Sequence, residues 1–490
     1  MKKIFIALLS ALCVLGLVGC GDSQTSGGKN PQKKKTTITY MGWDLGTESE
    51  PTLKRRMIEE FNEKSETIII DAQPTQDPIE EFYNTLAAGN ALPDVFMVVS
   101  VPTAITREWA LDLTPYVEKD SEWKDVEKTL AEAVTYNGHT YALPAAQHYN
   151  GFYANYELID EYDKTLAEDA NVAFAPGNFT KEEFYSTIEK VNEINEDGTS
   201  VVGINAVGDM INWLPSVLDT EGKFEHFVWD GEQFDFRGPV MINALTEIQK
   251  IGKIASGLTF NSHADYTGTA EEDPRIAKFG TADGSEAFLN GQIAFYQGAT
   301  SDDTSKINFD YSFVGYPNNR VVAVSDYICV SKDSKHKEEA YEVAKFLSYS
   351  AEGIETKYEI CKNDSNIKLA GLPVNTNPKV TEKWFESVST KGLKEIYDSV
   401  CAGETTVLVE GLKTIPGFDP ARFTAKTGIS IPGVRGGNEL TIGDLIWDVC
   451  EGSISIGAYE TNMTKDIADR LNEIVKTTFK EIEAIQKEDN

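Results

Sequence analysis

The chain has 490 residues, of which 41% are hydrophobic and 25% are charged, and its formal net charge is −33. This length is compatible with two or three domains and allows a sizeable hydrophobic core. Asp and Glu outnumber Lys and Arg by 78 to 45, and the basic residues form no cluster. This argues against nucleic acid as a partner, because phosphate contacts require a basic surface.

The N-terminus has the layout of an export signal. Lys2-Lys3 precede an apolar run from Ile4 to Val18, and polar residues follow Cys20. The run is shorter than the roughly 20 residues of a membrane-spanning helix, so a transmembrane anchor is the weaker interpretation. The Leu-Val-Gly-Cys sequence at 17–20 resembles the lipobox of bacterial lipoproteins, whose cysteine carries a diacylglyceryl group.

We therefore predict a lipoprotein signal peptide at residues 1–19, with Cys20 as the lipidated residue. The alternative is a plain signal peptide that happens to contain a cysteine. Residues 20–35 are rich in Gly, Ser, Gln, Asn and Lys without an apolar pattern, which predicts a flexible tether. We expect a monomer at the outer face of the cytoplasmic membrane that meets the bilayer only through its lipid anchor.

Four cysteines remain beyond the tether, at Cys329, Cys361, Cys401 and Cys450. An even number in an exported chain permits two disulfides, but the spacing selects none of the three possible pairings and matches no metal site. We favour buried free thiols.

The first folded segment alternates strands and helices. A β-prone run at 36–41 is followed by apolar residues at helical spacing from Leu53 to Phe61, and a second strand is predicted at 68–70. A second helix from Ile79 to Leu86 leads to the apolar run 95–99, which is typical of a strand covered on both faces. This order favours an α/β domain with a parallel sheet and right-handed crossovers.

In such sheets, ligands bind at the carboxyl ends of the strands, which directs attention to Trp43-Asp44 and to residues 99–101. A second α/β unit begins after Leu143-Pro144. There Thr180 and Glu183 form a capping box at the start of an amphipathic helix. Strands are predicted at 201–206 and at 293–296.

The last third of the chain is predicted to return to the first unit and then become helical. Residues 321–330 read as a strand, and residues 338–349 as a helix with its alanine, valine and leucine side chains facing inward. From about residue 379 the pattern is helical. Glycines on both sides of Arg435 predict a loop there.

Five segments, in this order, resemble the extracellular solute-binding proteins of the maltose-binding type and cover most of residues 36–380. They carry a Gly-Asn turn before a Pro-Asp-hydrophobic strand, a Leu-Asp-Leu-Thr-Pro run, a Tyr-Ala-Leu-Pro strand start, a Phe-Leu-Asn-Gly segment, and an Ala-rich helix followed by Gly-Leu-Pro-Val-Asn. The segments are residues 86–95, 109–116, 136–155, 287–295 and 337–375.

The resemblance implies a two-lobed, periplasmic-binding-protein-like α/β fold with a hinge and an interlobe cleft. It also implies a receptor that captures a small polar solute and delivers it to the permease subunits of an ABC importer. By analogy, 36–143 and 320–375 form the first lobe, and 144–319 and 376–490 form the second. Hinge closure around the ligand is the expected motion.

A sugar is the favoured solute, and its recognition requires planar polar side chains for paired hydroxyls and aromatic faces for the ring. By the same resemblance, the expected ligand contacts are Trp43, Asp44, His148, Tyr149, Trp213, Gln297, Asp326, Tyr327 and Arg435. The alternatives are that Trp43 seals the sheet edge, that Trp213 packs in the core, and that His148 and Arg435 are ordinary surface residues.

Two departures from the family weaken the inference to an oligosaccharide. Ala299-Thr300-Ser301 stands where sugar-binding members often carry a tryptophan, and Val98 stands where an aromatic residue is common. A monosaccharide, a modified sugar or another polar solute therefore stays open.

The main enzymatic alternative is an exported glycoside hydrolase, which needs only two carboxylates across a cleft. With 78 acidic residues such pairs arise by chance, so their presence does not decide the matter. The sequence contains no Gly-x-Ser-x-Gly elbow, His-Glu-x-x-His helix or phosphate loop, and its five histidines are dispersed. We therefore expect a binding protein without catalytic activity, metal or cofactor.

Overall fold

The computed structural model describes residues 35–47, 50–166, 169–193, 200–254, 273–364, 366–369, 371–432, 434 and 439–489. The predicted signal peptide, Cys20 and Arg435 lie outside the described residues.

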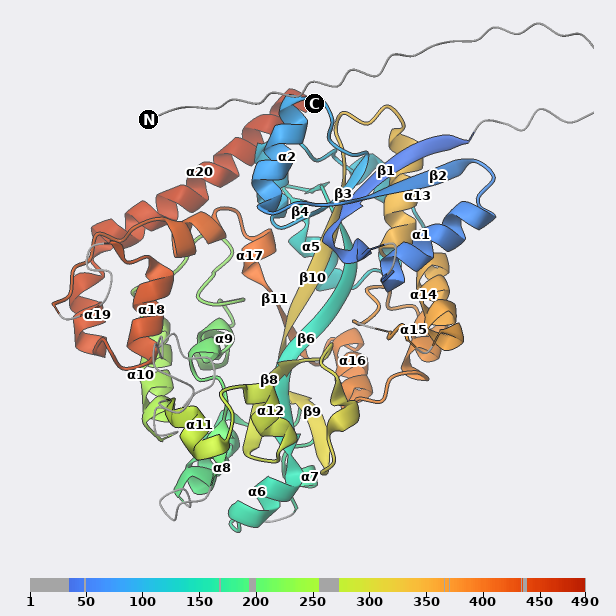
Figure 1. Cartoon of the computed structure of the whole chain (residues 1–490). Helices are drawn as coiled ribbons and strands as arrows, with labels where there is room; N and C mark the ends of the chain where they lie inside the picture. The colour runs from blue at the N-terminus through green and yellow to red at the C-terminus, as the bar shows by residue number, and fades with distance from the viewer. Residues whose placement is uncertain are drawn as a thin grey trace, which may run out of the picture.

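A mixed nine-stranded sheet runs through the molecule in the order β2-β1-β3-β10-β6-β8-β7, with β11 paired to β10 and β9 paired to β6 (Figure 1). The strands are β1 (Thr36–Gly42), β2 (Ile68–Pro74), β3 (Val95–Val98), β6 (Leu143–Asn155), β7 (Val202–Ile204), β8 (Ile293–Ala299), β9 (Tyr311–Gly315), β10 (Arg320–Val330) and β11 (Thr406–Val409). The short strands β4 (Thr135–Tyr136) and β5 (His139–Thr140) form a separate pair. Because β1 pairs in parallel with both β2 and β3, the predicted parallel sheet of the first segment is confirmed.

The helices are α1 (Leu53–Lys64), α2 (Ile79–Ala88), α3 (Val101–Thr106), α4 (Thr114–Val117), α5 (Lys128–Ala133), α6 (Tyr156–Tyr162), α7 (Ala170–Ala173), α8 (Lys181–Glu193), α9 (Leu214–Leu218), α10 (Pro239–Ile254), α11 (Pro274–Phe279), α12 (Gly284–Leu289), α13 (Lys337–Leu347), α14 (Ala351–Asn363), α15 (Pro378–Phe385), α16 (Leu393–Cys401), α17 (Gly411–Thr414), α18 (Ile442–Cys450), α19 (Ile456–Asn462) and α20 (Lys465–Asp489). Shorter helical turns used below are η1 (Trp43–Leu45), η4 (Gly208–Asn212) and the π-type turn η6 (Pro420–Thr424).

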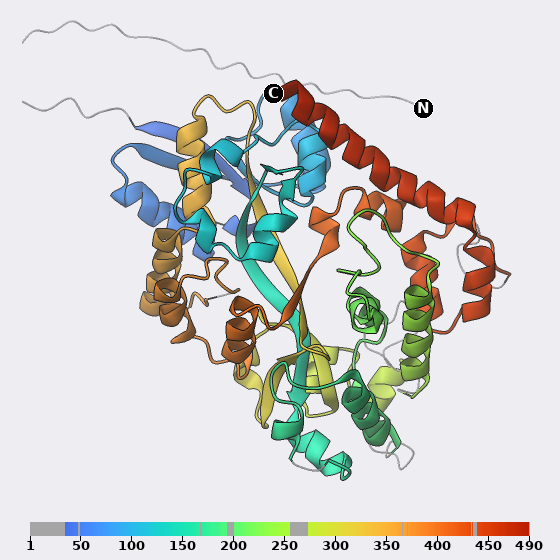
Figure 2. The same cartoon turned by 180° about the vertical axis from the view of Figure 1, so that it is seen from behind.

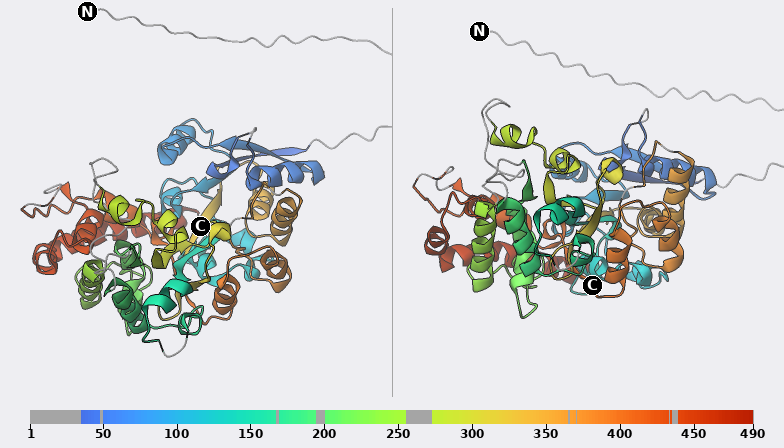
Figure 3. Two further views of the ribbon diagram at one scale, coloured as in Figure 1. Left: turned by 60° about the horizontal axis from the view of Figure 1, so that its bottom comes forward. Right: turned by 90° about the horizontal axis from the view of Figure 1, so that it is seen from below.

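The two longest strands, β6 and β10, connect two groups of elements (Figures 1 and 2). One end of β10 pairs with β3, the middle of β10 pairs with the start of β6, and the far end of β6 pairs with β8 and β9. From below, α8, α10 and the C-terminal helices lie on one side of these strands and α13 to α16 on the other (Figure 3). This arrangement confirms the predicted two-lobed α/β fold.

The last helix, α20, contacts elements of both lobes. Near its middle, the ring of Phe479 stacks on Trp229, with ring centroids 6.2 Å apart. One turn further on, Ile482 is fully buried in a cluster that includes Tyr83 and Phe96 of the first sheet segment. The side chain of Gln486 also donates a hydrogen bond to the carbonyl of Tyr136, at 2.8 Å. The helix therefore links the lobes at a second place, apart from the crossing strands.

Predictions that depend only on residues close together in the sequence are confirmed. Glu183 and Thr180 exchange side-chain and backbone hydrogen bonds at the start of α8, as a capping box requires. Along α13, Ala340, Val343 and Leu347 are fully buried.

The helical pattern expected from residue 379 onward is interrupted by β11. Its Thr-Val-Leu-Val sequence pairs in parallel with Arg320–Ala323 of β10, a partner that lies far away along the chain. The four described cysteines are free thiols, as predicted, but the predicted burial is wrong for two of them, because Cys361 is half-buried and Cys401 is exposed. Within the described ranges, no helix has both the length and the apolar character needed to cross a bilayer.

Truncating Ile482 tests the second link between the lobes. Because this side chain is fully buried, Ile482→Ala should lower the free energy of unfolding by about 2–5 kcal/mol in chemical denaturation. The matched control is Ile69→Ala, at a position that is 38% exposed, where we expect a change within about 0.5 kcal/mol. Equal effects of the two substitutions would contradict the docking of α20 on the first lobe.

Candidate functional site

The crossing strands present one accessible face between the lobes. Side chains alternate along a strand, and on β6 the half-buried positions are Ala146, His148 and Asn150, whereas the residues between them are buried. On β10, Asp326 is half-buried in the same way and pairs opposite Ala146. Polar groups from both strands therefore line the floor of the cleft.

The first-lobe wall of this cleft is formed where β1 ends. Asp44 follows in η1, where its carboxylate accepts a 2.9 Å hydrogen bond from the Tyr40 hydroxyl and lies 3.5 Å from Lys54 Nζ. Burial and the nearby charges of Asp44 and Asp326 raise the pKa of Tyr40, so both carboxylates lie close to one phenol. Trp43, beside Asp44, is 36% exposed.

Asp326 forms a salt bridge with Lys413, which lies on α17. Lys413 Nζ lies 3.0 Å from the carboxylate and also donates to the carbonyl of Ser325. Next to this pair, burial lowers the pKa of His148, an effect that the charge of Asp326 partly offsets. The imidazole of His148 is therefore neutral at neutral pH.

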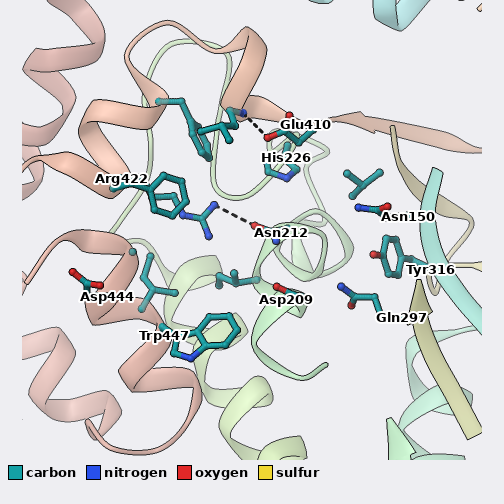
Figure 4. Close-up of a pocket in the computed structure, with 17 residues that line it drawn as sticks. Asn150, Asp209, Asn212, His226, Gln297, Tyr316, Glu410, Arg422, Asp444 and Trp447 are labelled. Atoms are coloured by element: carbon teal, nitrogen blue, oxygen red, sulfur yellow. Dashed lines mark hydrogen bonds between the residues drawn. The ribbon is translucent and has the colours of Figure 1, made fainter. Parts of the chain in front are cut away.

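A cavity of about 300 Å³ lies on the second-lobe side of the cleft floor (Figure 4). This volume is at the small end of the range for ligand sites. Its walls come from the crossing strands, η4, the end of β8, α17, η6 and α18. The lining residues are Asn150, Asp209, Ile211, Asn212, His226, Gln297, Tyr316, Val322, Glu410, Leu412, Phe418, Arg422, Phe423, Gly443, Asp444, Ile446 and Trp447.

Charged and polar groups face each other across this cavity. Arg422 Nη1 donates to Asn212 Oδ1 at 3.2 Å, and the backbone N–H of Leu412 donates to one carboxylate oxygen of Glu410 at 3.0 Å. Burial raises the pKa of Glu410. Burial, together with the charge of Arg422, lowers the pKa of His226 to about 3, and its Nδ1 accepts from the Gly411 N–H. The pocket thus holds a neutral imidazole between a guanidinium and a carboxylate.

Aromatic side chains cover other parts of the pocket wall. Tyr316 lines the cavity and stacks on Trp213, with centroids 4.8 Å apart and an interplanar angle of 15°. Trp213 itself is fully buried behind Tyr316 and also packs edge-on against Phe152. Trp213 therefore supports an aromatic residue of the pocket and does not line it in this structure.

Among the predicted ligand residues that the structure describes, Gln297 alone lines the cavity. Its backbone exchanges hydrogen bonds with Asn205, which fixes the end of β8. His148 and Asp326 lie on the cleft floor, and Trp43 and Asp44 lie on the first-lobe wall.

Two tyrosines of the predicted set lie apart from this group. Tyr149 and Tyr327 are at most 1% exposed and lie at the alternate, buried positions of β6 and β10. In this structure neither is open to a ligand, because each side chain is packed on the covered face of its strand. Many of the cavity residues that the sequence analysis missed, including Arg422 and Trp447, lie on η6, α17 and α18, in a part of the chain that the family resemblance did not cover. Others, such as Asn212 and His226, lie within the covered part.

His226 makes the stability of the protein depend on pH. Its pKa is about 3 in the folded chain and 6.5 ordinarily, so the unfolded chain binds the proton more readily in between, and stability is lost as pH falls below 6.5. When the pH is lowered from 7.5 to 5, the free energy of unfolding of His226→Gln should therefore decrease by about 2 kcal/mol less than that of the native protein, as measured by denaturant titrations. The exposed His336→Gln is the control, and an unchanged pH dependence in His226→Gln would contradict a buried neutral imidazole.

Solved structures share this fold over nearly the whole chain. An ABC substrate-binding protein from Listeria monocytogenes, in complex with cycloalternan, is 18% identical, with a TM-score of 0.58 and coverage of 90% of this chain and 99% of that one. The sugar-binding protein MalE from Xanthomonas citri is 15% identical, with a TM-score of 0.61 and coverage of 90% and 98%. The GacH receptor of Streptomyces glaucescens, solved unliganded and with acarbose, is 15% identical, with a TM-score of 0.57 and coverage of 91% and 99%.

No curated protein sequence matches the chain. Residues 46–352, which are more than half of the chain, match the family of bacterial extracellular solute-binding proteins. The two lobes, the crossing strands and the polar cleft between them agree with that match. The protein belongs to the bacterial extracellular solute-binding protein family.

Proposed function

We propose that the protein is the sugar receptor of an ABC importer. The observation that carries this proposal is the cavity beside the crossing strands, where carboxylate, amide and guanidinium groups alternate with the rings of Tyr316 and Trp447. Polar planar groups match the paired hydroxyls of a sugar, and aromatic faces cover its C–H surfaces. The similar proteins with cycloalternan and acarbose support the same class of ligand.

The ligand contacts come from both sides of the cleft. We propose that the second lobe binds first, through Asn150, Gln297, Asp209 and Arg422, and that closure then brings Asp44 and Trp43 onto the ligand. In this proposal His148 and Asp326 lie under the ligand at the hinge. The lobes comprise residues 36–143 with 320–375 and residues 144–319 with 376–490, as the family resemblance implies.

The same proposal extends to the cellular setting. The protein is held at the cell surface by a diacylglyceryl group on Cys20, acts as a monomer, and hands its ligand to the permease subunits without chemical change. The lipobox-like sequence at 17–20 and the polar segment that follows it support the anchor. Membership of the extracellular solute-binding family supports binding without turnover.

The ligand class can be tested by thermal-shift measurements on the purified full-length protein. We expect selective stabilisation by a mono- or disaccharide, of about 2.7 kcal/mol at 100 times the dissociation constant, because the ligand binds only the folded state. The sugar should be recovered unchanged. Stabilisation only by amino acids or peptides would contradict the sugar assignment, and product formation from a glycoside would show an enzyme instead.

Closure onto the first lobe predicts an effect of Asp44. Asp44→Asn should weaken sugar binding by about 1.5–3 kcal/mol in calorimetry, because a hydrogen bond to a charged group is lost in the closed state. The matched control is Asp71→Asn on the edge strand β2, where the exposed carboxylate accepts a hydrogen bond from Gln73. Unchanged affinity in Asp44→Asn would contradict a first-lobe contact at this position.

A further inference from the structure

Arg422 is a largely buried cation, and its charge needs a stabilising partner. It lies in η6, and its guanidinium lies over three phenyl rings, those of Phe227, Phe418 and Phe423, at 4.5, 5.5 and 4.9 Å from their centroids. Burial lowers its pKa to about 10, so the group is still charged at neutral pH. Aromatic faces offset part of the lost hydration of a cation, but a buried charge ordinarily also has an anionic partner.

The guanidinium of Arg422 has one hydrogen-bond acceptor among the described residues. Nη1 donates to Asn212, whereas Nε is buried and has no acceptor among the described residues. Arg422 also forms no salt bridge with any carboxylate in the described part of the chain. Nη2 likewise has no acceptor among the described residues but, unlike Nε, keeps accessible surface, so it can donate to an oxygen of a ligand in the cavity.

Two other arginines show how this chain completes such groups elsewhere. Arg275 directs Nε and Nη2 at the two oxygens of Asp273, at 3.0 and 2.7 Å. Arg320 has no carboxylate partner, but Nε, Nη1 and Nη2 all donate to oxygens of Ser216 and Asn318. Arg422 differs from both, because it lines the cavity with an Nη2 donor that has no acceptor among the described residues (Figure 4).

The nearest acidic groups do not take this place. Asp209 and Glu410 line the same cavity and interact with Arg422 only through longer-range charge, and one oxygen of Glu410 is already bonded to the Leu412 N–H. Figure 4 shows Arg422 and Glu410 on different sides of the pocket. The pocket is therefore polarised, with a guanidinium that has no carboxylate partner among the described residues on one side and a hydrogen-bond acceptor on the other.

We propose that Arg422 binds a carboxylate of the transported solute through Nη2, and that this solute is an acidic saccharide carrying a uronic acid unit. The hydroxyls of such a unit meet Glu410, Asn150 and Gln297, while its carboxylate supplies the anion that Arg422 lacks. The inference rests on the proposed sugar function. The carboxylate requirement itself comes from the guanidinium without an anionic partner and applies equally to an amino acid ligand, which the experiment distinguishes.

The test compares paired ligands on the purified full-length protein. Glucose and galactose, their uronic acids, the corresponding disaccharides with and without a uronate, and a panel of amino acids are used as probes in thermal-shift and calorimetric titrations. We expect the uronates to stabilise the protein more than the matched neutral sugars do. The preference should decrease with rising salt concentration, since an ion pair is formed.

Substitution then assigns the preference to Arg422. Arg422→Gln, which keeps a donor for Asn212 without the charge, should weaken uronate binding by about 30-fold or more and weaken neutral-sugar binding by a clearly smaller factor, because a neutral sugar loses a hydrogen bond and not an ion pair. Arg422→Lys should also weaken uronate binding, because a compact ammonium group lacks the spread, planar donors with which the guanidinium bonds Asn212 and a carboxylate together. Arg56→Gln is the matched control, since Arg56 is an exposed arginine paired with Glu59 on α1.

Each outcome separates the two proposals. Equal or weaker binding of the uronate by the native protein overturns the inference and leaves the sugar function standing, and this comparison needs no variant. Uronate binding that survives Arg422→Gln also overturns it. Binding of amino acids alone, lost in Arg422→Gln, would support carboxylate binding at Arg422 and overturn the sugar function together with the uronate assignment.

Discussion

The backbone pairing of β6 with β10 is the interaction on which the rest of the structure depends. These strands run antiparallel from one lobe to the other, so their hydrogen bonds fix the register of both lobes at once. The alternation of side chains along them then decides which groups face the cleft. His148, Asn150 and Asp326 are at accessible positions, whereas Tyr149 and Tyr327 are buried because they are one residue out of phase.

The linkage between the lobes also limits how they can move. Besides the crossing strands, α20 packs Phe479 against Trp229 and inserts Ile482 into the first-lobe cluster. A hinge motion therefore has to rotate the lobes about an axis that keeps these contacts or shifts them by small sliding movements, as packed helices allow. The cleft walls at Asp44 and at the cavity lie away from this link and are free to approach one another.

Burial changes the protonation of some ionisable side chains in the cavity and leaves that of Arg422 unchanged. Glu410 and His226 are shifted by burial toward their neutral forms, whereas Arg422 stays charged because the intrinsic pKa of a guanidinium is too high for burial to neutralise it. Among the described lining residues, a ligand that enters the pocket thus meets one persistent positive charge, together with carboxylates and several hydrogen-bonding groups. This makes selectivity depend more on the group facing Arg422 than on the hydroxyls shared by most sugars.

The sequence by itself determined the local elements and the family. Patterns of short range were sufficient for β1, β3, the capping box at Thr180 and the inward face of α13, because each depends on neighbouring residues. The sequence also located Asp44 and Gln297 near the ends of their strands. It did not reveal β11, which is stabilised by pairing with a distant edge of β10.

Only the tertiary structure decided which side chains share the pocket. Arg422 and Asn212 are 210 residues apart, and no periodicity relates them. The sequence predicted Trp213 as a ligand platform, whereas packing places Tyr316 in front of it. The physical reason is that a binding site is assembled from the ends of separate elements, and the contacts that bring those ends together are made only when the lobes fold around the crossing strands.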